Sequence, residues 1–176
     1  ITPYTTGQFM MIDTSTRRNL ELVETLREKQ KRGSLLWVLD KTKTAMGARL
    51  LRSFIEQPLI DKTEIERRQQ AIEELNMNYI SREEIREYLN SVYDLERLMG
   101  RISYKTANPR DLLSFKNSLE MLPYIKDILG EFSCELLKKM NEDLDPLRDL
   151  YELIDRSIVD EPPISLREGN IIKDGY

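Results

Sequence analysis

Six charged residues near the middle of the sequence are the side chains most capable of chemistry. Carboxylates and guanidinium groups occur together there, as Asp94, Glu96, Arg97, Arg101, Arg110 and Asp111. Two carboxylates share acid–base work only where both face one site, and helical residues two apart, such as Asp94 and Glu96, point to different faces. We therefore expect a charge network that bridges two helices, with Arg97 and Arg101 as its cationic members.

The sequence offers no activated nucleophile and no familiar cofactor motif. It contains no histidine and one cysteine, Cys134, so the usual zinc ligand sets cannot be assembled. None of the seven glycines is followed by lysine, which excludes the phosphate-binding Gly-x-x-x-x-Gly-Lys-Ser/Thr loop within this chain. We therefore predict no catalytic residue, no metal site and no cofactor site in this chain.

The elements that must position these charges are predicted to be helices. Seven glycines and seven prolines among 176 residues are fewer than the turns of an all-β fold require. The expected fold class is mainly α, a helical bundle-like domain with short extended segments at both ends. We expect one domain over 1–176, with an extended lead-in at 1–12, a helical region at 13–160 and an extended segment at 161–176.

Apolar spacing and capping residues locate the expected helices. Asn108, Pro109 and Asp111 form a helix start, because asparagine caps and proline needs no N–H in the first turn. Ser81 and Glu84 form a capping box. Gly47 lies inside a helix at a cost of about 1 kcal/mol against alanine, which indicates close helix packing. The predicted helices cover 13–33, 46–55, 61–75, 81–102, 108–122, 124–129, 133–140 and 146–158.

The charge is divided unevenly along the chain. The formal net charge is −4, with +4 over residues 1–60 and −8 over residues 61–176. A free-standing nucleic-acid binder usually has a basic excess, so any phosphate contact would lie in the N-terminal third. No stretch reaches the roughly 18 apolar residues of a membrane span, and no signal peptide is recognisable. We therefore expect no membrane partner and a cytoplasmic location.

Five segments, in order and at matching spacing, carry a family resemblance. They are 13–22 (DTSTRRNLEL), 39–59 with its TAMGARLL run and closing QPL, 65–72 (IERRQQAI), 94–112 with DLER and PRDL, and 169–176. Together they resemble the core, or lever, domain of the MutS family of DNA mismatch repair proteins. The chain is therefore identified as a partial core domain of that family.

The resemblance implies a mechanical role. The full-length parent would be an ATPase that uses ATP and Mg outside this fragment, acts as a homodimer, binds double-stranded mismatched DNA and works with a MutL-like partner. This segment would couple ATP-driven changes to clamping of mismatched DNA through packed helices. Two alternatives stay open: the same domain of a MutS-like recombination paralogue, or a helical scaffold that only binds proteins.

The first matching segment supplies candidate interdomain residues, which are Asp13, Arg17, Arg18, Asn19 and Glu21. Arg17 and Arg18 lie near a helix start, where cations oppose the helix dipole. We expect an interdomain salt bridge to hold them, with phosphate contact as the second possibility. Trp37 and the apolar residues around it are expected to be core.

Overall fold

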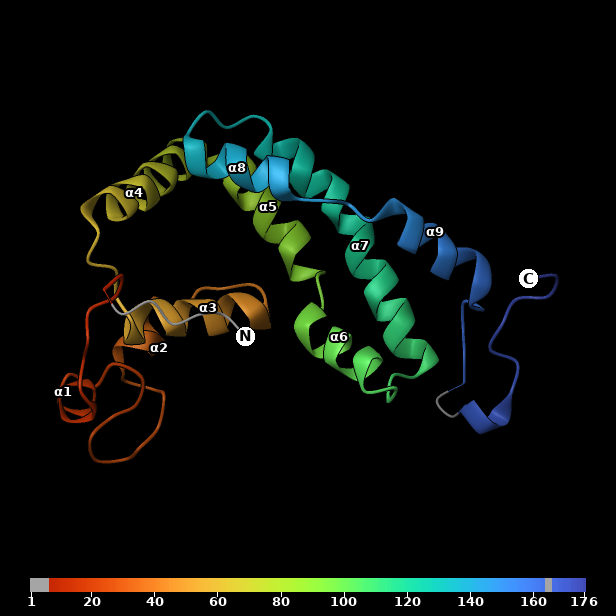
Figure 1. Cartoon of the computed structure of the whole chain (residues 1–176), viewed down its shortest axis with the longest axis horizontal. Helices are drawn as coiled ribbons and strands as arrows, with labels where there is room; N and C mark the ends of the chain where they lie inside the picture. Colours follow the sequence, from red (N-terminus) through yellow and green to blue (C-terminus); the bar gives the residue numbers. More distant parts are fainter. Residues whose placement is uncertain (1–6, 164–165) are drawn as a thin grey trace. The chain divides into compact units, whose positions relative to one another are not determined.

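The computed structural model describes residues 7–163 and 166–176, and these residues are mainly helical (Figure 1). Within this part of the chain, β pairing is limited to two isolated antiparallel bridges, Phe9 with Leu59 and Ile158 with Ile172. The predicted mainly α fold class is therefore confirmed. No helix of the described residues is long and apolar enough to cross a membrane.

The chain divides into two compact units, Ile1–Glu73 and Glu74–Tyr176. Unit 1 holds α1 (Thr14–Asn19), α2 (Leu35–Leu39), α3 (Ala45–Glu56) and most of α4 (Lys62–Met77). Unit 2 begins in the last turns of α4. The assignment of 1–176 to one core domain stays a prediction, and residues 1–6 of the expected lead-in lie outside the described part.

Side-chain caps start the helices of unit 1. Asp13, Ser34 and Thr44 each accept a hydrogen bond from the backbone N–H three residues later, at 2.8, 3.2 and 3.0 Å. Such caps pair N–H groups that have no partner inside the helix. On α3, the guanidinium of Arg68 from α4 lies 3.9 Å from the centre of the Phe54 ring. This cation–π contact joins α3 to α4.

The helix predicted over 13–33 is wrong beyond Asn19, where α1 ends. Glu21 adopts a left-handed backbone with φ of 48°, and its side chain accepts a hydrogen bond from Leu26 N at 2.6 Å. The backbone then pairs with α2 through Leu36 N and Leu22 O at 2.9 Å. Because Leu22 and Leu36 are both buried, packing against α2 replaces continuation of the helix.

The prediction that Trp37 is core is also wrong. Its side chain is 48% exposed, whereas Leu36 is 5% exposed. A helix of five residues, such as α2, turns one narrow side inward, and Leu36 occupies it.

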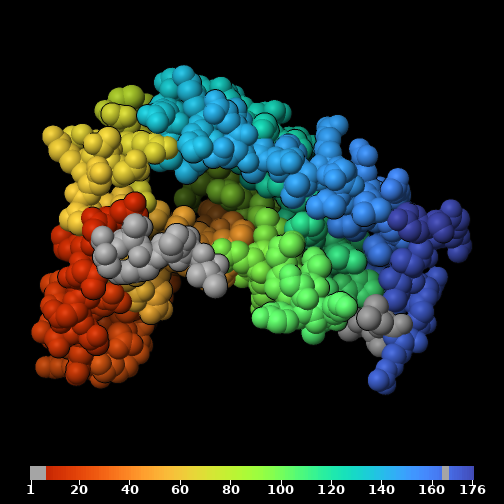
Figure 2. Space-filling model, in the orientation of Figure 1, coloured from red at the N-terminus to blue at the C-terminus, as the bar shows by residue number. Residues whose placement is uncertain are grey.

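Unit 2 is built around α7 (Pro109–Leu129), which packs against α5 (Tyr79–Asn90), α6 (Leu95–Ser103), α8 (Glu135–Asp143) and α9 (Arg148–Ser157) (Figure 1). Its core cluster consists of Leu98 from α6 with Phe115 and Leu119 from α7. Figure 2 shows side chains of α8 and α9 covering one face of α7. The long helix is therefore the element on which the others are assembled.

The single helix predicted over 81–102 is wrong, because two helices, α5 and α6, cover this range. The chain breaks at 91–94, where Tyr93 N donates to Ser118 Oγ of α7 at 3.0 Å and Asp94 caps α6. The Ser81 capping box is also wrong. Helix α5 begins earlier, at Tyr79, and the Ser81 hydroxyl donates to Glu131 at 2.8 Å.

The break predicted after residue 122 is absent, because α7 continues through Pro123 to Leu129. Proline lacks an N–H, so the Leu119 carbonyl loses its usual helical donor. Burial of Leu119 at 2% exposed, and of Ile125 at 7%, accounts for the continuation. The helix start predicted at Asn108, Pro109 and Asp111 is confirmed, and the structure adds a reciprocal hydrogen bond from Asn108 N to the Asp111 side chain, which completes a capping box.

The C-terminal segment is largely irregular. It includes a short 3-10 helix, Leu166–Glu168, and returns to the end of α9, where Val159 N donates to Ile171 O at 2.9 Å. Residues 164 and 165 of the segment predicted as extended lie outside the described residues.

Candidate functional site

The junction of α6 and α7 brings together two of the six charged residues singled out from the sequence. Arg101 lies in the last turn of α6, and Asp111 lies in the first turn of α7. Their Nη1 and Oδ1 atoms are 2.9 Å apart. Each charge also suits its helix end, since cations favour a C-terminus and carboxylates an N-terminus.

Both partners of this ion pair make further hydrogen bonds. The Nη2 of Arg101 donates to the carbonyl of Thr106 at 3.2 Å, and Oδ2 of Asp111 accepts from Asn108 N at 2.7 Å. The ion pair therefore joins α6 to α7 and also fixes the loop between them. The Asp111 side chain is 13% exposed, so solvent weakens the attraction less than at a fully exposed pair.

The other four members of the predicted charge network lie elsewhere on α6 and α7 or directly beside them. Asp94 caps α6 through Arg97 N at 3.2 Å, and the side chains of Glu96 and Arg97 are exposed. Arg110 donates from Nε to the carbonyl of Pro162 at 3.2 Å, which ties α7 to the C-terminal segment. A depression of about 270 Å³ lies beside the ion pair, lined by Tyr93, Asp94, Arg97, Leu98, Arg101, Asp111 and Ser114.

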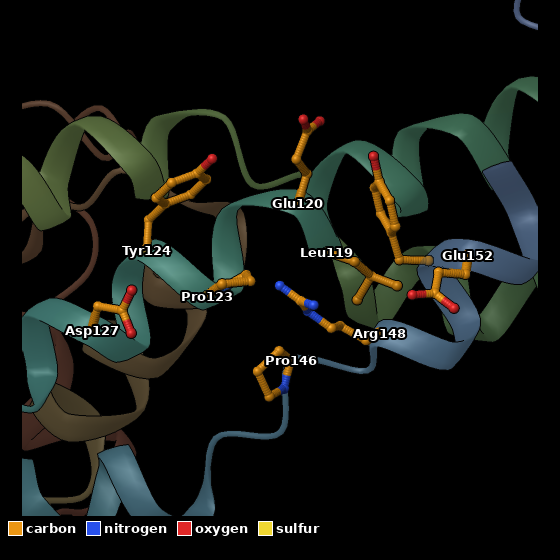
Figure 3. A pocket seen from close by; sticks show the side chains of 9 residues that line it. Leu119, Glu120, Pro123, Tyr124, Asp127, Pro146, Arg148 and Glu152 are labelled. Atoms are coloured by element: carbon orange, nitrogen blue, oxygen red, sulfur yellow. The ribbon is translucent and has the colours of Figure 1, made fainter.

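A larger depression, of about 500 Å³, lies between α7 and α9 (Figure 3). Its floor includes Leu119 and Pro123, and the Arg148 guanidinium points toward Pro123. Three carboxylates, those of Glu120, Asp127 and Glu152, also line it. Among the described residues, no group of three or more potential metal ligands is close enough to hold an ion.

A carboxylate of α4 forms a contact that sequence reasoning missed. Glu74 Oε1 accepts from the backbone N and the Oγ of Ser133, both at 2.6 Å, and Oε2 accepts from Cys134 N at 2.8 Å. These hydrogen bonds, those from Ser133 first, lower the pKa of Glu74 from 4.5 to about 2. Glu74 belongs to an ordinary charged helix, so no local signal distinguishes it.

A second missed contact joins α7 to α9. Lys116 Nζ lies 3.0 Å from Asp155 Oδ1. This hydrogen bond raises the pKa of Lys116 and lowers that of Asp155. The two residues are far apart in the sequence, and the periodicity of each helix says nothing about which charges meet.

The candidate residues of unit 1 make mostly local contacts. Asp13 caps α1, Arg17 donates from Nε to the carbonyl of Ile12 at 3.1 Å, and Glu21 holds the following loop. Arg18 and Asn19 are exposed on α1. The interdomain role of these five residues stays a prediction.

Gly47 has close neighbours from the loop before its helix. A Cβ placed there would lie 3.0 Å from Thr44 Oγ1 and 3.5 Å from Thr42 Cβ. We predicted close packing of another helix at Gly47, but the nearest neighbours belong to the segment before α3, namely Thr44, which caps the helix, and Thr42.

Comparison with known proteins identifies the family. The protein-family model described as MutS domain III matches residues 15–174 of the chain. A protein of Lachnoclostridium phytofermentans named DNA mismatch repair protein MutS is 68% identical over 176 residues, which is the whole chain and 19% of that relative. Proteins of the same name are 50% identical over 173 residues in Clostridium tetani (98% of the chain, 20% of the relative) and 53% over 176 in Halothermothrix orenii (100% and 20%).

The chain therefore spans about a fifth of the length of these relatives. Because the family model covers nearly all of it, the chain belongs to the MutS family of DNA mismatch repair proteins, as a domain III.

Proposed function

We propose that this chain is the lever of a mismatch recognition protein and couples ATP-driven changes to clamping of mismatched DNA. The observation that carries the proposal is the way α7 is held. Asp111 at its start pairs with Arg101 of α6, Lys116 pairs with Asp155 of α9, and Lys126 near its end donates to the carbonyl of Leu144 after α8. A helix tied along its length to three others suits transmission of a displacement.

The charge of the chain supports transmission over DNA binding by unit 2. Residues 74–176, which form unit 2, hold 14 Lys+Arg and 21 Asp+Glu, a net charge of −7, and phosphate groups would be repelled by such a surface. Recognition of mismatched double-stranded DNA would then belong to other domains of the parent. The parent would be a cytoplasmic homodimer that binds ATP and Mg outside this segment and works with a MutL-like partner.

The names of the relatives favour mismatch repair over a recombination paralogue, since each is called DNA mismatch repair protein MutS.

The test uses the full-length parent and fluorescence anisotropy with a G·T-mismatched and a matched duplex, with and without ATP. The variant is Arg101→Gln, which removes the α6–α7 ion pair. Arg156→Gln at an exposed position of α9 is the control, because it removes the same charge outside this site. We expect Arg101→Gln to keep its preference for the mismatch without nucleotide and to lose much of the ATP-driven change in affinity.

Two results would count against the proposal. A wild-type parent whose affinity for the mismatch does not respond to ATP would remove the coupling itself. A response of Arg101→Gln equal to that of wild type would show that coupling does not pass through the α6–α7 junction.

A further inference from the structure

Helix α8 begins without a cap of its own. Its N-cap residue is Cys134, which makes no side-chain hydrogen bond to the helix. The first N–H groups of a helix have no partner inside it. Glu74 of α4 instead accepts from the backbone N–H of Ser133 and of Cys134, and its carboxylate lies at the positive end of the α8 dipole. The start of α8 is therefore paired by a residue that lies 60 positions earlier in the sequence.

We propose that this contact of Glu74 with Ser133 and Cys134 is the joint through which a displacement of α4 reaches α7. The inference rests on the proposed lever function and assigns Glu74 as a positioning residue within it. Figure 1 shows the end of α4 beside the start of α8.

Helix α8 is well suited to pass a displacement on. Phe132, just before it, and Leu137, within it, are 3% and 4% exposed, and α8 packs against α7. At the other end of α8, Lys126 of α7 donates from Nζ to the carbonyl of Leu144. Side chains of α4 and α7 thus hold the two ends of this short helix, which is anchored between them by buried residues.

The place of Glu74 in the chain strengthens the argument. The boundary between the two units falls inside α4, directly after Glu73. Helix α4 therefore carries the backbone from unit 1 into unit 2, and Glu74 is the first residue on the far side. A displacement that arrives along α4 meets the contact with α8 in the first turn of unit 2.

A second contact lies close to the joint. Ser81 Oγ in α5 donates to Glu131 Oε2 at 2.8 Å, two residues before Ser133. The loop before α8 is thus held from α5 as well as from α4, and loss of the Glu74 contact leaves this loop attached. Opening of the joint should therefore be local and should leave unit 2 folded.

The experiment compares Glu74→Gln with Glu73→Gln in the full-length parent. Glutamine at position 74 keeps one carbonyl acceptor but places an NH₂ group opposite a backbone N–H. Glu73 is exposed, so Glu73→Gln removes the same charge from the adjacent position of the helix. Hydrogen exchange at amides 133 and 134, the two backbone N–H groups that donate to Glu74, reports whether the joint is open. Anisotropy with G·T-mismatched and matched duplexes, with and without ATP, reports coupling.

For Glu74→Gln we expect faster exchange at amides 133 and 134 and an unchanged mismatch preference without nucleotide. We also expect an ATP-driven change in mismatch affinity about fivefold smaller than in wild type, a typical size for coupling between sites. Glu73→Gln should match wild type in every measurement. A merely structural cap would raise exchange without altering the ATP response, and that result would overturn the proposal.

Two further outcomes are distinguishable. If wild-type parent shows no ATP response, the lever function fails and the joint fails with it. If Glu74→Gln does not fold, Ser133→Ala takes its place, since it removes one of the three hydrogen bonds to Glu74. A smaller ATP response in Ser133→Ala supports the joint, and a response equal to that of wild type contradicts it.

Discussion

Arg101 and Asp111 join the last turn of α6 to the first turn of α7 through a guanidinium–carboxylate contact of 2.9 Å. Asp111 also accepts a hydrogen bond from Asn108 N and so completes the capping box of α7. One carboxylate therefore serves both the start of the longest helix and its attachment to a neighbour. Asp111 therefore fixes the connection between α6 and α7.

Replacement of this carboxylate should destabilise unit 2. We expect Asp111→Ala to lower the free energy of unfolding by about 1–2 kcal/mol, because it removes the capping interaction and the ion pair together. Urea denaturation followed by far-UV circular dichroism measures the change. Glu120→Ala, at an exposed position of the same helix, is the control and should change stability by less than about 0.5 kcal/mol. Equal urea midpoints for the two variants would contradict the role of Asp111.

The start of α7 at Asn108 could be predicted from sequence because the residues that form it lie within one turn. The ends of other helices could not, because distant residues determine them. Tyr93 N is paired by Ser118 Oγ of α7, and this tertiary bond is part of what separates α5 from α6. Nothing in the local sequence of 81–102 contains that information.

The charged sites show the same division. Arg101 and Asp111 could be assigned to one charge network from the sequence, because both flank one predicted loop. Glu74 and Ser133 could not, because their contact depends on how α8 packs beside α4. When a carboxylate caps a helix other than its own, the spacing of the residues around it in the sequence does not indicate the contact.

Acid should weaken the attachment of Glu74. Its pKa in the folded chain is about 2, below the ordinary value of 4.5. A lowered folded-state pKa contributes stability that is fully present above the unfolded value and is lost as pH falls through the folded value. The contribution should therefore be present above pH 4.5 and disappear toward pH 2.

The measurement is the free energy of unfolding as a function of pH for wild type, Glu74→Gln and Glu73→Gln. Other carboxylates also titrate in this range, among them Asp40, whose pKa the Lys31 hydrogen bond lowers to about 2. The informative quantity is therefore the difference from wild type. We expect the difference for Glu74→Gln to shrink as pH falls from 4.5 toward 2. A difference that stays constant over this range would show that the Glu74 charge does not stabilise the fold.

Two helical glycines should respond to substitution in opposite directions. Gly100 in α6 has no atom within 4 Å of a built Cβ, whereas Gly47 would meet Thr44 Oγ1 at 3.0 Å. Gly100→Ala should stabilise the chain by up to about 1 kcal/mol through helix propensity. Gly47→Leu should destabilise it by about 1–3 kcal/mol, because the larger side chain must displace the residue that caps α3. Urea midpoints test both predictions. An unchanged midpoint for Gly47→Leu would show that the close contact with Thr44 does not explain why glycine occupies this position.

The isolated chain should not distinguish mismatched from matched DNA. Its basic residues are concentrated in 1–60, with a net charge of +4, and the rest of the chain carries −8. Contacts with phosphates alone are independent of sequence and weaken steeply as salt rises. Fluorescence anisotropy with a G·T-mismatched and a matched duplex should therefore show either no binding or weak, equal binding that vanishes at moderate salt. A clear preference for the mismatch would show that this segment itself reads DNA, and the lever would then be more than a transmitting element.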